Sequence, residues 1–135
     1  MYTARKINEL VRKASELNLE GAALLGEFTV LELADVANGI GASWMPEWSR
    51  ALVTGLHPSL EAAALIHDLQ YHAGGDPEAR RLVDKSFLRN CGISARSAYG
   101  WWDPRRYAAL RSAKRFYRLL RLFGGMAWRE CSGNE

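Results

Sequence analysis

The 135-residue chain has 48% hydrophobic and 24% charged residues, which is ordinary for one globular domain with a modest core. No apolar run approaches the ~20 residues that span a bilayer, and no secretory signal precedes the first charges, so we expect a cytoplasmic protein with reduced thiols. The net charge of +3 is unevenly divided: residues 1–68 hold 5 Lys/Arg against 9 Asp/Glu, and residues 69–135 hold 13 against 6.

The first half of the chain carries helix signals. Apolar residues recur at helical spacing over residues 7–17, which predicts an amphipathic helix. Thr29 and Glu32 form a capping-box pattern, which predicts a short helix over about 30–37 that the following Asn-Gly pair ends. Pro46 then suits the first turn of a further helix.

The second half of the chain also contains residues that start and end helices. A helix is predicted over 59–72, and Asp76 with the proline after it starts another over 77–90, which Gly92 would end. A second Asp-Pro pair starts a long basic helix over 104–123, halted by two glycines. Strand signals are scarce, so the sequence predicts a single all-α domain, residues 1–135, of about six helices.

A His-Asp doublet interrupts the apolar run of the predicted helix 59–72. About four residues separate this helix from the next, so the two should form an antiparallel helical hairpin. His67 and Asp84 are then level to within ~3 Å along the axis. Tyr71, one turn after His67, shares its face and could donate its hydroxyl to Asp84. The pattern predicts a base, His67, oriented by a carboxylate, Asp84, that a tyrosine holds.

The second member of the doublet points elsewhere. Successive helical residues are about 100° apart, so Asp68 should face the loop that contains Gly39 and Gly41. A carboxylate beside free loop carbonyls is typical of a calcium site. Two plainer interpretations stay open: a satisfied structural histidine, and a surface ion pair between Asp84 and the arginines one turn before it.

The same residues carry a resemblance. His67-Asp68-x-x-Tyr71 followed by Asp84-x-x-Phe87 resembles the catalytic-helix signature of the phospholipase A2 superfamily, and residues 38–125 resemble an uncharacterised family of phages and prophages. The resemblance implies a phospholipase A2-like core and calcium-dependent ester hydrolysis of phospholipid. His67 would activate a water, Asp84 and Tyr71 would orient the imidazole, and Asp68 with carbonyls near Gly39 and Gly41 would hold Ca²⁺. The phage family implies a helper or virion-associated role.

A second resemblance concerns the stretch around the doublet. Residues 64–69 also look like the core of HD-type metal phosphohydrolases. Those enzymes need a further histidine well upstream, and the nearest one here, His57, lies only ten residues before His67. The ligand set therefore looks incomplete, and we rank this interpretation below the first.

The predicted helix 104–123 is basic and amphipathic, and Trp101 and Trp102 precede it. One interpretation is an interfacial helix on an anionic phospholipid surface, with the tryptophans at the membrane interface. The alternatives are a non-catalytic protein that binds an acidic macromolecule or nucleic acid, for which no recognised motif is present, and an ordinary terminal helix. The predicted membrane- or partner-binding residues are Trp101, Trp102, Arg105, Arg106, Arg111, Lys114, Arg115, Arg118 and Arg121.

Overall fold

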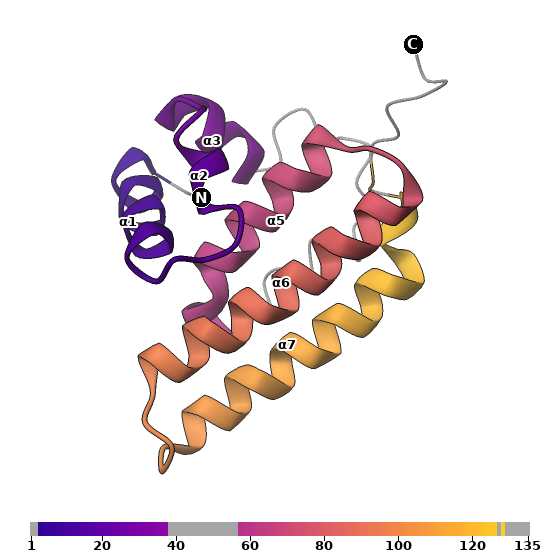
Figure 1. Ribbon diagram of the computed structural model, residues 1–135. Coiled ribbons are helices and arrows are strands. Elements are labelled where there is room, and N and C mark those ends of the chain that lie inside the picture. The colour runs from indigo at the N-terminus through magenta and orange to yellow at the C-terminus, as the bar shows by residue number, and fades with distance from the viewer. Residues whose placement is uncertain (1–2, 38–56, 127, 129–135) are drawn as a thin grey trace.

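The computed structural model describes residues 3–37, 57–126 and 128. Within these residues the chain forms helices and turns and no strand, so the all-α prediction is confirmed. Figure 1 shows two groups of helices that share α5: a short N-terminal group, and the long pair α6 and α7. No helix of the described part is long and apolar enough to cross a membrane.

The N-terminal group packs on one side of α5 (Glu61–Ala73). It consists of α1 (Ala4–Glu16), α2 (Ala22–Leu25) and α3 (Val30–Ala37). The capping box predicted at the start of α3 is present, because the Thr29 and Glu32 side chains each accept a hydrogen bond from the other's backbone N–H at 3.1 and 2.9 Å. The cluster that these helices bury against α5 is aliphatic: its largest members include Ile7, Leu10, Leu25, Leu33, Ile66 and Leu69.

The long helices pack on the other side. After a turn at Gly74, whose φ of 73° suits glycine, α6 (Pro77–Ala98) runs back beside α5, and α7 (Pro104–Phe123) returns along α6 (Figure 1). Asp76 caps α6 and Asp103 caps α7, each accepting a backbone N–H in the first turn. A 3₁₀ turn, Pro58–Leu60, leads into α5.

Two details differ from the sequence-based expectations, and a third is not tested. Helix α6 does not end at Gly92 but continues to Ala98, since Gly92 is buried within the helix and small neighbours such as Cys91 and Ala95 pack against α5 and α7. Tertiary packing here outweighs the low helix propensity of glycine. The four-residue helix α2 was not predicted. The helix expected at Pro46 lies outside the described residues.

Candidate functional site

The structure brings together the three residues predicted to form a base and its support. The His67 Nε2 atom lies 3.0 Å from Asp84 Oδ1, and the Tyr71 hydroxyl donates a hydrogen bond to the same oxygen at 2.6 Å. His67 and Tyr71 come from α5 and Asp84 from α6, so the contact depends on how these two helices pack. The local reason is the four-residue spacing, which puts the histidine and the tyrosine on one face of α5.

The second oxygen of the carboxylate is occupied by arginine. Arg121, near the end of α7, donates to Asp84 Oδ2 at 2.7 Å, and the Arg80 guanidinium lies 3.6 Å from the same atom. Arg80 also donates to the backbone carbonyl of Leu120 at 3.0 Å. Arg121 was expected on the solvent face with the other basic residues of α7; its side chain instead turns inward and is 31% exposed.

The sequence contains a signal that could have found this contact. The turn between α6 and α7 is centred near Trp101, which Asp84 precedes by 17 residues and Arg121 follows by 20. With antiparallel helices and a rise of about 1.5 Å per residue, the two are level to within about 5 Å. Residue spacing from the connecting turn therefore predicts the contacts between α6 and α7 as well as those between α5 and α6.

The cluster is buried. Asp84 is 0% exposed and His67 is 3% exposed, so Asp84 is not the partner in a surface ion pair. The His67 ring packs against Tyr71 and Phe87, with ring centroids 4.3 and 4.8 Å away. Water is therefore largely displaced from around the hydrogen bonds, which strengthens them.

The electrostatics keep the carboxylate ionised. Burial by itself would raise the pKa of Asp84, but hydrogen bonds from His67, Tyr71 and Arg121 outweigh it and hold that pKa below its ordinary value. Burial, together with the hydrogen bond to Asp84, raises the pKa of the Tyr71 phenol, so that the phenol stays a proton donor. An ionised carboxylate can only accept, so His67 donates from Nε2; the neutral tautomer that this bond selects has its lone pair on Nδ1.

The end of α7 closes over one side of the cluster. A Cβ atom added to Gly124 would lie 2.8 Å from the Tyr71 hydroxyl, so glycine allows the backbone to approach. Trp128 is 7% exposed, donates from its indole N–H to the carbonyl of Gly75 at 2.8 Å, and presents its ring edge-to-face to Tyr71. None of these contacts was predicted from the sequence.

Of the calcium ligands that the resemblance implies, only Asp68 lies within the described residues. Asp68 is partly exposed, and no hydrogen bond or ion pair joins its side chain to another described residue. Burial raises the pKa of its carboxyl to about 6, and the electrostatic interaction with His67 opposes this rise. Gly39 and Gly41 lie outside the described residues. Within residues 3–37, 57–126 and 128, no three acidic, histidine or cysteine side chains gather as metal ligands. Of the ligands that the resemblance implies, the described residues therefore contain one carboxylate of the six to eight oxygens that calcium takes.

The remaining predicted residues lie on the surface of α7 and at the turn before it. Trp101 and Trp102 are 74% and 71% exposed. Arg105 is held by Asp103 and lies over the Tyr99 ring, and Arg106 is half-buried. Four basic residues form an exposed row along the helix, which we call the basic face of α7: Arg111, Lys114, Arg115 and Arg118.

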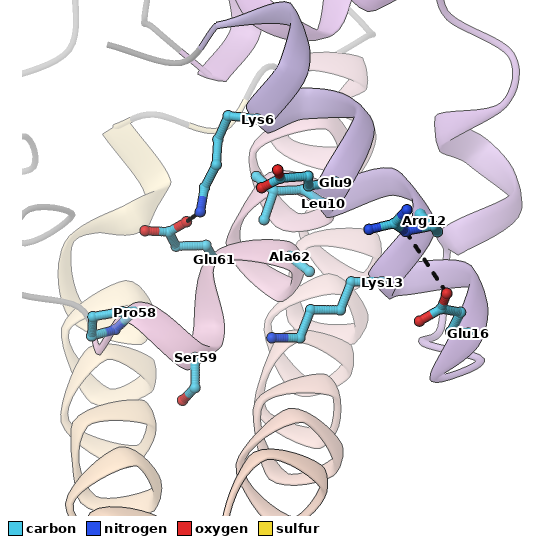
Figure 2. A pocket seen from close by; sticks show the side chains of 10 residues that line it. All are labelled: Lys6, Glu9, Leu10, Arg12, Lys13, Glu16, Pro58, Ser59, Glu61 and Ala62. Atoms are coloured by element: carbon cyan, nitrogen blue, oxygen red, sulfur yellow. Dashed lines mark ion pairs between the residues drawn. The ribbon is translucent and has the colours of Figure 1, made fainter.

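A surface pocket of about 320 Å³ lies elsewhere, between α1 and the start of α5 (Figure 2). Its charged side chains largely pair with each other, as in the contacts of Lys6 with Glu61 and of Arg12 with Glu16. His57 bonds Ser59, which lines this pocket, and packs against Tyr99. His57 thus caps the 3₁₀ turn before α5. None of these contacts joins His57 to His67, as the two histidine ligands of a metal phosphohydrolase would require.

The chain matches no protein-family model, no curated protein and no solved structure. Any function must therefore be argued from the site itself.

Proposed function

We propose that the protein is a phospholipase A2-like hydrolase of phage type, in which His67 acts as general base in the hydrolysis of a phospholipid ester. The single observation that carries the proposal is the buried contact between His67 Nε2 and the Asp84 carboxylate. It fixes the ring and its tautomer, which a general base requires and a solvated surface histidine lacks.

The proton movements follow from this geometry. His67 Nδ1 takes a proton from a water, and the oxygen of that water attacks the ester carbonyl. The C–O bond of the ester then breaks, the fatty acid is released, and the imidazolium returns the proton to the departing alkoxide. Asp84 stays ionised throughout and stabilises the imidazolium, as in other His-carboxylate pairs. Because His67 is 3% exposed, substrate and water must reach Nδ1 through a local opening of the surrounding chain.

The proposed hydrolase uses calcium. This part of the proposal is based on the resemblance, and Asp68 is the implied ligand that lies within the described residues. When bound, calcium would supply Lewis-acid stabilisation of the oxyanion. We expect titration calorimetry to detect saturable calcium binding by the intact protein and its loss in Asp68→Asn. Asp35→Asn, an exposed carboxylate on α3, is the matched control and should bind as the wild type does. Equal binding by wild type and Asp68→Asn would remove Asp68 as a ligand.

Substitution of the base tests the hydrolase directly. We expect fatty-acid release from vesicles of phosphatidylcholine and phosphatidylglycerol, measured with calcium and with chelator. His67→Gln should lower the rate by about 10²- to 10⁴-fold, which is the usual contribution of a positioned general base. His72→Gln, an exposed histidine at the end of the same helix, should leave the rate unchanged. The mechanism is refuted by a His67→Gln enzyme as active as wild type, and the function by a folded wild type that releases no fatty acid.

A second function is favoured by the basic face of α7, whose four side chains form no ion pair with another described residue. In this alternative the protein is non-catalytic and binds an anionic surface or an acidic macromolecule. Lipid binding should require Trp101 and Trp102. Binding to nucleic acid should instead fall steeply with salt and depend on the basic face.

A further inference from the structure

Arg121 differs from the other described arginines of α7, because its side chain reaches the buried carboxylate of Asp84. It donates to Asp84 Oδ2 at 2.7 Å, while His67 and Tyr71 share Oδ1. A carboxylate held at one oxygen can still rotate about its Cβ–Cγ bond. A second bond at the other oxygen, from a different helix, fixes the plane of the group.

We propose that Arg121 is a positioning residue of the site: by fixing the Asp84 carboxylate, it sets the orientation of the His67 ring. The inference rests on the proposed function for its kinetic consequence, but the orientation itself can be measured without catalysis. Arg121 would touch neither substrate nor the attacking water, since its guanidinium lies on the Oδ2 side of Asp84 and His67 on the Oδ1 side.

Arg80 does not duplicate this role. Its guanidinium is 3.6 Å from Asp84 Oδ2, longer than a hydrogen bond, and it donates to the Leu120 carbonyl instead. Arg80 thus joins α6 to the residue that precedes Arg121, and so supports the end of α7 from which Arg121 reaches Asp84. Two further contacts hold the same end of α7. Gly124 lies close to the Tyr71 hydroxyl, and Trp128 donates a hydrogen bond to the carbonyl of Gly75.

The first experiment records the ring N–H signals of ¹⁵N-histidine by NMR, with His67 identified by its loss in His67→Gln. We expect a slowly exchanging Nε2–H signal in wild type, its loss or displacement in Arg121→Ala, and its retention in Arg121→Lys, which keeps a charged donor. Arg96→Ala, an exposed arginine on α6, is the matched control and should resemble wild type. An unchanged His67 signal in a folded Arg121→Ala protein would overturn the proposal, whether or not the protein is a hydrolase.

The second experiment measures hydrolysis of a short-chain phospholipid below its micelle concentration, so that binding to a lipid surface does not contribute. Arg121→Ala should lower kcat by about tenfold to hundredfold with KM little changed, which is the effect of a misplaced catalytic group. Added guanidinium at millimolar concentration should restore part of the rate to Arg121→Ala and none to His67→Gln. A rise in KM alone, or no rescue, would contradict a positioning role. A wild type without activity would refute the proposed function and leave the NMR experiment to decide on Arg121.

Discussion

The two faces of α5 differ in what they bury. One face meets α1, α2 and α3 through aliphatic side chains such as Ile66 and Leu69. The other face presents His67 and Tyr71 to the carboxylate of Asp84 on α6. The first arrangement needs only size and hydrophobicity, whereas the second needs particular atoms at particular distances. One side of α5 therefore stabilises the fold by burial alone, and the other side holds a specific polar cluster.

The largest effect should come from the aliphatic face. Leu69→Ala removes a side chain that is 1% exposed, and we expect the free energy of unfolding to fall by about 3 to 4 kcal/mol through lost burial and a residual cavity. Urea unfolding measures this, and Leu82→Ala, at a position that is 51% exposed, should cost less than about 0.5 kcal/mol. The His67 ring N–H signal should persist in folded Leu69→Ala. If it vanished, the two faces of α5 would not be separable.

A smaller effect is expected from the polar face. Asp84→Leu removes the acceptor that His67, Tyr71 and Arg121 share. We expect a loss of about 2 to 3 kcal/mol, below the usual cost of breaking a fully buried pair because Arg121 is 31% exposed. The double variant Asp84→Leu/Arg121→Met should be more stable than Asp84→Leu, since Arg121 is then no longer left without its partner, while His67 and Tyr71 lose the same acceptor in both variants. A double variant that is less stable than Asp84→Leu would show that Arg121 stabilises the fold independently of Asp84.

The smallest effect is a dependence on pH. Because the pKa of Asp84 is lower in the folded protein than the value of about 3.9 in an unfolded chain, its contribution to stability is present above about pH 4. The contribution is lost as the pH falls through the folded pKa. Urea unfolding of wild type and Asp84→Asn should therefore give a stability difference that is constant near neutral pH and shrinks in acid. A difference that grew on acidification would contradict the lowered pKa.

The contrast extends along α7. Arg118 and Arg121 are the same residue type, three positions apart, yet the first is exposed and the second binds Asp84. The sequence predicted both arginines to lie on one exposed basic surface of the helix. A spacing of three residues keeps the two side chains on neighbouring positions of one helix face. What distinguishes them is height along α7, because Arg121 lies level with Asp84 and Arg118 lies about one turn nearer the start of the helix.

The sequence by itself determined much of this protein. Periodic apolar residues and Asp-Pro starts set the helices, and the spacing of His67, Tyr71 and Asp84 predicted which side chains would meet. These features are local or depend on one short turn, so few arrangements can satisfy them. Local signals were less reliable where packing opposed them, as at Gly92, which α6 continues through because its neighbours are buried.

Only the tertiary structure decided the rest. The contact of Arg121 with Asp84 joins residues 37 apart, and the contact of Trp128 with Gly75 joins residues 53 apart, so both depend on where α7 ends against α5 and α6. The sequence offers several arginines and tryptophans, and propensity does not distinguish among them. The register of three packed helices selects one arginine, because a buried carboxylate accepts a bond only from the donor whose helix face and height match its own.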